Sequence, residues 1–94
     1  MMQFLVDIKI HSPQLAKPLL PAHLDYLNRC FESGDILLFA AYADCSGGML
    51  IAKADSEAAL EELLARDPLR KANCAAWQSQ SMHVARASLE GLLK

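Results

Sequence analysis

The 94-residue sequence lacks the features that mark several large classes of protein. It has no run of lysine and arginine and a formal net charge of −2, so nucleic-acid binding is not expected. No apolar run approaches the roughly 20 residues that a membrane-spanning helix needs, so a membrane protein is not expected either. Residues 1–11 lack a basic stretch followed by a long apolar one, and no signal peptide is predicted.

Cysteine is also scarce, and the chain has no metal-binding motif. Cys30, Cys45 and Cys74 are odd in number and form no Cys-x-x-Cys pair, which argues against a disulfide framework and a zinc site. They favour a reducing, cytoplasmic compartment. His11 and His83 have no ligand at a suitable spacing, so no metal is predicted. Without a glycine-rich phosphate-binding loop, no organic cofactor is predicted.

Apolar residues are plentiful: 53% of the chain is hydrophobic. This length suits one small domain over residues 1–94. Small domains bury only a modest share of their surface. A chain with this many apolar residues therefore favours pairing with a second copy, which buries more of them.

The hydrophobic pattern predicts four strands separated by two main helices. Strands are predicted at 4–11, 35–43, 49–54 and 74–86, and helices from about Pro21 to Ser33, at 56–66 and at 87–94. This order is that of an α+β, ferredoxin-like βαββαβ fold, in which a four-stranded antiparallel sheet has helices on one face. The strand at 35–43 is apolar on both sides, which favours a homodimer through the open face.

Chain direction in this fold brings two polar residues to one end of the sheet. The predicted first helix has an apolar stripe made of Leu20, Leu24, Leu27 and Phe31. His23 lies in the first turn of this helix and on the same face. Asp67 ends the second helix and continues the stripe that contains Leu60. A carboxylate beside an imidazole fixes its tautomer and supports the imidazolium. The pair is therefore a candidate for proton transfer with a bound small molecule.

Structural interpretations of the same residues stay open. A histidine on an apolar helix face is usually a core residue with a hydrogen-bond partner, and an aspartate before a proline often only ends a helix. Tyr42 and Ser46 are candidates for substrate contacts, although strand aromatics usually serve packing. Cys45, in the turn, is either a nucleophile or incidental.

Three stretches of the sequence resemble one known family. "PAHLDYL", "SGDILLFAAY" and "LLARDPLRKANCAAW" are similar to the YciI-like (YCII-related) family, and the resemblance covers nearly the whole chain. His23 matches the family histidine and Asp67-Pro68 its Asp-Pro, whereas Leu69 replaces the family's aromatic residue. The resemblance implies a dimeric α+β-barrel assembly, a relation to muconolactone isomerases, and a site centred on His and Asp.

Together these observations predict a small-molecule enzyme without a cofactor: an isomerase, lyase or hydrolase. His23 would act as general base or acid, with Asp67 orienting it. The substrate is unidentified, and the family resemblance points to a lactone or another carbonyl compound. The alternative is a non-catalytic small-molecule-binding or dimerisation module in which the His/Asp pair is structural.

Overall fold

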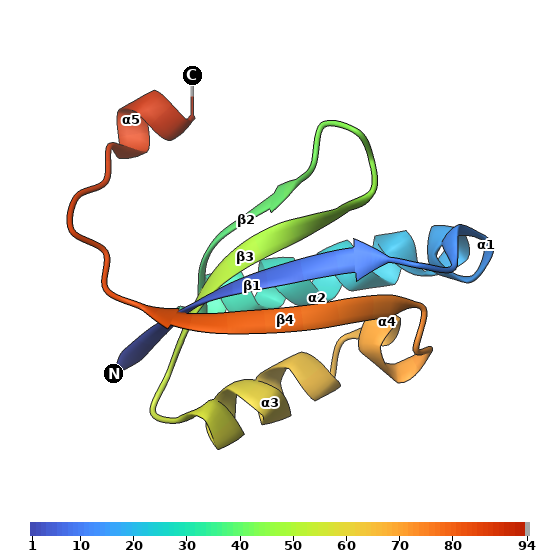
Figure 1. The fold of residues 1–94 in the computed structure, drawn as a ribbon, viewed down its shortest axis with the longest axis horizontal. Helices are drawn as coiled ribbons and strands as arrows, with labels where there is room; N and C mark the ends of the chain where they lie inside the picture. Colours follow the sequence, from blue (N-terminus) through green and yellow to red (C-terminus); the bar gives the residue numbers. More distant parts are fainter. Residues whose placement is uncertain (94) are drawn as a thin grey trace.

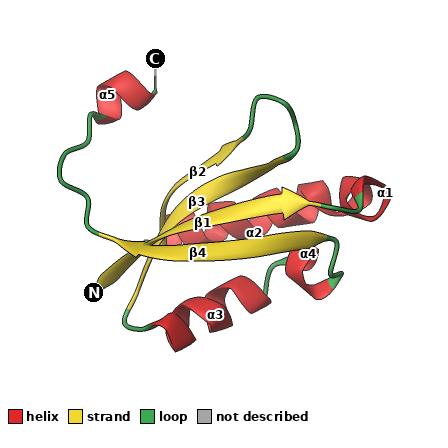
Figure 2. Ribbon diagram, in the orientation of Figure 1, coloured by secondary structure: helices red, strands yellow, loops and turns green. Residues whose placement is uncertain are grey.

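The computed structural model describes residues 1–93, which form one antiparallel sheet with helices on one face (Figures 1 and 2). The strands are β1 (Met2–Ile10), β2 (Ile36–Ala41), β3 (Gly47–Ala54) and β4 (Ala75–Met82). The helices are α1 (Pro13–Ala16), α2 (Leu20–Ser33), α3 (Glu57–Ala65), α4 (Pro68–Lys71) and α5 (Leu89–Leu92), with a 3₁₀ turn, η1 (Lys17–Leu19). None of these helices is both long and apolar enough to cross a membrane.

The sheet has the order β2-β3-β1-β4, and each neighbouring pair is antiparallel. This is the strand order of the ferredoxin-like arrangement, so the predicted α+β fold class is confirmed. The two strands at the centre, β1 and β3, pair along almost their whole length, from Met2 opposite Ala54 to Lys9 opposite Gly47.

Alternation along β1 builds the core. Phe4, Val6 and Ile8 are buried and point toward the helices, where they join Leu50 of β3 and Leu60 of α3 in one cluster. The residues between them point to the other face of the sheet. Burying these side chains supplies the main driving force for folding, at about 25 cal/mol for each Å² of apolar surface.

The buried face of α2 differs from the predicted apolar stripe. His23, Leu27 and Cys30 are the buried residues of this helix. Leu24 and Phe31, which the pattern assigned to the stripe with Leu20, are about half exposed at 48% and 50%. The buried face is rotated relative to the predicted stripe, because the helix packs against the core through His23 and the residues four and seven positions after it.

Local chemistry sets the helix ends as the sequence predicted. Gly34 has the left-handed φ of 88°, and its N–H bonds to the carbonyl groups of Cys30 and Phe31. Ser56 begins α3, because its side chain accepts a hydrogen bond from the N–H of Ala59 at 3.1 Å.

Residues 13–19, for which no helix or strand was predicted, form the short helical turns α1 and η1. Pro13 lies in the first turn of α1 and Pro18 in that of η1, where a missing N–H costs little. The other boundaries also shift: β4 ends at Met82, well before Arg86, and α5 is shorter than predicted. The last residue of that predicted helix, Lys94, lies outside the described residues.

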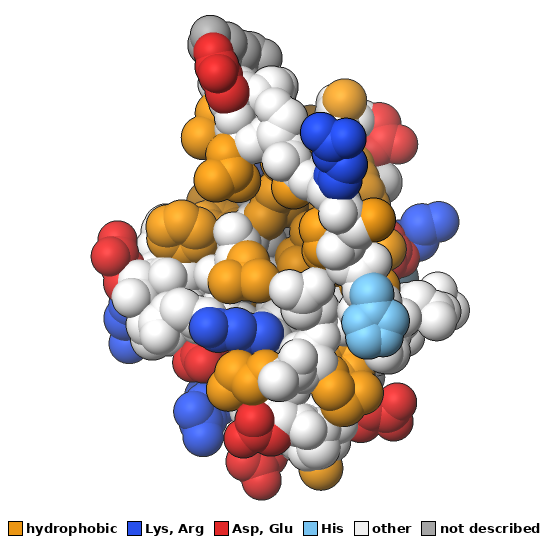
Figure 3. Space-filling view, turned by 90° about the vertical axis from the view of Figure 1, so that its left-hand side faces the viewer, with side chains coloured by type: hydrophobic (Ala, Val, Ile, Leu, Met, Phe, Trp, Pro, Cys, Tyr) orange, Lys and Arg blue, Asp and Glu red, His pale blue; other side chains and the backbone are white. Residues whose placement is uncertain are grey.

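The C-terminal segment extends away from the rest of the molecule. Figure 1 shows α5 clear of the sheet, and Figure 3 shows hydrophobic side chains gathered beneath this segment. Leu89, Leu92 and Leu93 are 72%, 59% and 86% exposed. No helix within residues 1–93 covers the open face of the sheet (Figure 2).

Candidate functional site

His23 and Asp67 meet between α2 and the start of α4. Nδ1 of His23 lies 2.8 Å from Oδ1 and 2.7 Å from Oδ2 of Asp67. His23 is 8% exposed and Asp67 is 1% exposed. Residues 44 positions apart are thus joined in a buried hydrogen bond, at the end of the sheet that chain direction indicated.

Asp67 is held by the backbone that follows it. Its Oδ1 accepts a hydrogen bond from the N–H of Leu69 at 2.8 Å, and Asp67 is the N-cap of α4. Pro68 occupies the first position of that helix, where it preserves the turn. Asp67 therefore begins α4 instead of ending the second helix as expected, since α3 already ends at Ala65. The predicted pairing of its carboxylate with the imidazole is present as well.

The hydrogen bond to Asp67 determines which nitrogen of His23 is available. A carboxylate accepts only, so Nδ1 carries the proton and donates it, and neutral His23 keeps a lone pair on Nε2. Within the part of the chain that the structure describes, Nε2 has no hydrogen-bond partner. His23 lines the cavity described next.

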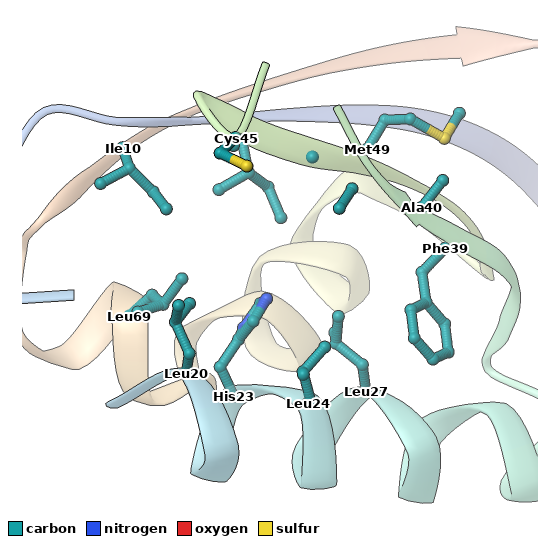
Figure 4. Close-up of a pocket in the computed structure, with 14 residues that line it drawn as sticks. Ile10, Leu20, His23, Leu24, Leu27, Phe39, Ala40, Cys45, Met49 and Leu69 are labelled. Atoms are coloured by element: carbon teal, nitrogen blue, oxygen red, sulfur yellow. The ribbon is translucent and has the colours of Figure 1, made fainter. Parts of the chain in front are cut away.

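A cavity of about 250 Å³ lies between α2 and the sheet (Figure 4). Leu20, His23 and Leu24 rise into it from α2, while Ile10 and Cys45 lie on the opposite wall. Among the described residues that line it, none is Lys, Arg, Asp or Glu, and only His23 and Cys45 have side chains with exchangeable protons. The walls therefore favour a compact, mainly apolar ligand with few polar atoms.

Tyr42, a predicted substrate contact, lies outside the cavity lining. Its hydroxyl donates a hydrogen bond to Asp7, a residue of β1 that alternates with the buried Val6 and Ile8. This bond stabilises the neutral phenol and raises the pKa of Tyr42 above its usual value. The substrate contact proposed for Tyr42 stays a prediction, and the cavity does not support it.

Ser46, the second predicted contact, is exposed in the turn between β2 and β3. Its backbone N–H donates to Oδ1 of Asp44 at 3.0 Å, and hydrogen bonding from Ser46 lowers the pKa of Asp44. The residue before it, Cys45, lines the cavity instead, as do Gly47 and the following glycine. The role of Ser46 likewise stays a prediction.

The pattern of the sequence missed much of the cavity wall. Leu20 and Leu24 line it while remaining partly exposed, and their helical spacing with His23 was the available signal. Phe39 faces the cavity because β2 has an irregular register between Ile36 and Leu38, and no signal in the sequence predicted that irregularity.

Other titratable groups lie away from the cavity. His11 is exposed and lies 3.2 Å from the hydroxyl of Ser12. Burial raises the pKa of the Cys30 thiol, and burial likewise raises that of Tyr26, whose hydroxyl donates to the carbonyl of Leu63. No group of three or more His, Cys, Asp or Glu side chains suited to a metal ion occurs in residues 1–93.

Solved structures that share this fold include two enzymes. A 5-chloro-2-hydroxyhydroquinone dehydrochlorinase from Burkholderia phenoliruptrix AC1100 is 24% identical, with a TM-score of 0.74 over 87% of this chain and 94% of that chain. A muconolactone isomerase is 17% identical, with a TM-score of 0.74 over 95% of this chain and 96% of that chain. At these identities the likeness establishes the fold alone.

No curated protein matches the sequence. The family model of the YCII-related domain, however, matches residues 2–79, which is most of the chain and includes both His23 and Asp67. The chain therefore belongs to the YCII-related family.

Proposed function

We propose that this protein is a small-molecule enzyme that moves a proton on a compact carbonyl compound, with His23 as general base or acid and Asp67 as its orienting partner. One observation carries the proposal. The imidazole donates from Nδ1 to a buried carboxylate, and the remaining nitrogen is free at an apolar cavity. Such an arrangement accepts a proton at Nε2 while the carboxylate stabilises the imidazolium that forms.

The surroundings strengthen this chemistry. Ile8, Ile10 and Leu27 form apolar walls beside the imidazole, so water is partly excluded and electrostatic interactions within the cavity are stronger than in bulk solvent. Asp67 is buried and bonded on both sides, to His23 and to the N–H of Leu69, which fixes its direction. A base held in this way loses little orientation when it reacts.

The proposed substrate is an oxygenated ring compound such as a lactone or a quinone. A cavity of about 250 Å³ accommodates a single substituted ring, since an engineered cavity of about 150 Å³ holds benzene. The similar dehydrochlorinase structure contains 2,5-dihydroxybenzoquinone, and the other similar enzyme is named for a lactone. Isomerisation and elimination of such compounds move a proton at a carbon beside the carbonyl group, and in hydrolysis a general base takes the proton of the attacking water.

We further propose that the protein forms a homodimer through the open face of the sheet and works in the reducing cytoplasm. Leu5, which alternates with the buried Phe4 and Val6, is 36% exposed on the face of the sheet that no helix of the described chain covers, and Leu37 of β2 is 42% exposed. The free thiols of Cys30, Cys45 and Cys74 support the reducing setting. No cofactor is part of the proposal.

The decisive experiment is solvent-deuterium exchange into candidate ligands. The protein is mixed in D₂O with uncharged lactones that have an acidic C–H beside the carbonyl group, and exchange is followed by NMR. We expect the exchange rate to fall by about 10²-fold or more in His23→Gln, because the base is lost. In Asp67→Asn it should also fall, because the imidazole loses its fixed tautomer.

His11→Gln is the matched control, since that histidine belongs to the same chain and does not line the cavity. The His11→Gln variant should catalyse deuterium exchange into the ligands at the native rate. Equal exchange by the native protein and His23→Gln, with all of the candidate ligands, would leave the pair with a structural role only.

The structural alternative has an observation of its own. Asp67 caps α4 and is almost wholly buried, as expected of a group that maintains the fold. In that case the cavity is a binding site without chemistry, and the ligands shift the His23 resonances in NMR spectra without any exchange of their protons.

A further inference from the structure

We propose that Cys45 is a second reactive group of the cavity, which captures electrophilic unsaturated carbonyl compounds of the quinone class as a thioether beside His23. The inference rests on the ligand class of the proposed function. It does not require His23 to be catalytic, and it assigns a modification site to a turn residue.

The position of Cys45 gives its thiol access to both solvent and cavity. The residue is exposed, and it lines the cavity on the wall opposite α2. Figure 4 shows the ring of His23 rising from α2 into the space below the sheet, with Cys45 across from it. A ligand that enters the cavity therefore lies between the imidazole and the thiol.

The backbone at Cys45 is an outlier. Its φ of 63° is in the left-handed region that favours glycine, asparagine or aspartate. The turn is fixed by hydrogen bonds from the N–H of Cys45 to the carbonyl of Tyr42, at 3.0 Å, and from the N–H of Tyr42 to the carbonyl of Gly47, at 2.9 Å. A strained residue held in place by its neighbours is a feature of functional sites.

His23 supplies an independent indication that this cavity binds a ligand. Its side chain is 10% exposed, lines the cavity, and has no partner for Nε2 within the described chain. A ring nitrogen at the wall of a mainly apolar cavity, with no partner in the described chain, is available to a ligand atom. The thiol and the free nitrogen thus serve the same occupant.

The chemistry balances without an added oxidant or reductant. The sulfur of Cys45 bonds to a ring carbon of the quinone, and the electron pair of that carbon–carbon double bond moves to the carbonyl oxygen. The thiol proton goes to this oxygen. The ring carbon then loses its own proton while the second carbonyl oxygen gains one, which gives a hydroquinone thioether. The lone pair of sulfur that forms the carbon–sulfur bond supplies the two electrons that reduce the ring.

The other two cysteines provide internal controls. Cys30 is 6% exposed and Cys74 is 0% exposed, and the thiol of Cys74 donates to the carbonyl of Leu69 at 3.6 Å. Neither lines the cavity. In the folded protein, only Cys45 is therefore available to a reagent.

The test uses 1,4-benzoquinone with the full chain and follows adduct formation by intact mass and peptide mapping at several reagent concentrations. We expect an adduct on Cys45 with a rate that saturates, because the reagent first occupies the cavity. The matched control is the double variant Cys45→Ser/Ser46→Cys, which moves the thiol one residue along the turn and off the cavity wall. Its rate should be linear in concentration and lower by about tenfold or more.

A second measurement locates the captured ring. The adduct should shift the imidazole resonances of His23 and leave those of His83 unchanged, since His83 follows the far end of β4. The proposal is wrong if adduct formation is linear in reagent concentration and equally fast for the native and moved thiols. It is also wrong if the adduct leaves the His23 resonances unchanged, because Cys45 then reacts as an ordinary exposed thiol.

Two measurements on the native protein separate this inference from the proposed function. Deuterium exchange into a ligand reports on the base at His23, whereas saturating adduct formation reports on Cys45. Capture without exchange in the native protein would refute only the proposed catalysis, and exchange without saturating capture would refute only the role of Cys45.

Discussion

His23 and Asp67 are nearly inaccessible to water and yet reach the wall of a cavity. Their side chains are 10% and 1% exposed, and they form the one buried hydrogen bond between two side chains among the described residues. Loss of either partner leaves the other without compensation, whether or not the pair is catalytic. Stability alone therefore cannot separate the two interpretations, and a cavity-bound ligand has to be part of the test.

A double-mutant cycle measures the coupling of the pair. Asp67→Ala should lower the free energy of unfolding by about 3 kcal/mol, because it leaves both the imidazole and the N–H of Leu69 unsatisfied. Urea denaturation of His23→Ala, Asp67→Ala and the double variant should give a coupling of about 1 kcal/mol or more. The exposed residue His11, changed to Ala, should cost less than about 0.5 kcal/mol.

Tyr42 makes the stability depend on alkaline pH. Its hydrogen bond to Asp7 raises the pKa in the folded state, so the bond stabilises the protein fully below the unfolded value of about 10 and is lost as pH rises through the folded value. Tyr42→Phe should therefore be less stable than the native protein at neutral pH. The difference should shrink above pH 10 or so in denaturation measured across the alkaline range. A difference in stability that stays constant across the alkaline range would contradict a stabilising role for the protonated hydroxyl.

At the scale of the elements, short segments place the site. The single turn of α4 exists because Asp67 caps it and Pro68 begins it, and the same turn brings Leu69 to the cavity. Cys45, a residue with a left-handed φ in the turn before β3, lines the cavity from the other side. The site is thus built where elements end, as expected for a rigid scaffold with functional loops.

The cap of α3 gives a prediction for a single helix end. Ser56→Ala removes the acceptor for the N–H of Ala59 and should cost about 1 kcal/mol of stability in urea denaturation. Ser88 makes the same contact with Gly91 in α5, which stands clear of the sheet. Ser88→Ala should therefore leave the unfolding transition almost unchanged, and an equal loss in both variants would contradict this account.

The first residue of β3 sits where no side chain fits. A Cβ on Gly47 would lie 1.9 Å from the carbonyl oxygen of Ile8, so Gly47→Ala must push β3 away from β1 and should cost about 3 kcal/mol or more. Gly34 also has a positive φ but has open space around it, and Gly34→Ala should cost only about 1 kcal/mol. Thermal unfolding of the two variants measures the contrast, and equal costs would rule out the steric explanation.

At the scale of the whole molecule, the two faces of the sheet have different roles. One face packs against α2 and α3 and contains the core and the cavity. The other has the exposed Leu5 and a polar region with Asp7 and Gln78, and no helix of the described residues covers it (Figure 2). A second copy would bury the apolar part of that face, which is the basis for the proposed homodimer.

Disruption of the open face tests the proposed assembly. Leu5→Lys places a charge at the middle of the sheet, and we expect it to convert a dimer to a monomer in sedimentation experiments, because an unpaired charge would be buried between the copies. Leu15→Lys, on α1 at 55% exposure, is the control and should leave the assembly unchanged. A native protein that sediments as a monomer at all concentrations would refute the dimer.

The sequence by itself determined the order of the elements, the buried face of β1 and the ends of α2 and α3. It also determined that His23 and Asp67 share one end of the sheet. These features follow from side-chain alternation, capping chemistry and chain direction, which are local or depend only on connectivity.

Only the tertiary structure decided what surrounds the pair. The rotation of α2 about its axis selects His23, Leu27 and Cys30 for burial and leaves Leu24 at the cavity, and the irregular register of β2 turns Phe39 inward. The tertiary structure also places Cys45 on the wall of the cavity, whereas Tyr42 and Ser46 lie outside the cavity lining. These outcomes depend on how the helix packs against the twisted sheet, a geometry that no short stretch of sequence specifies.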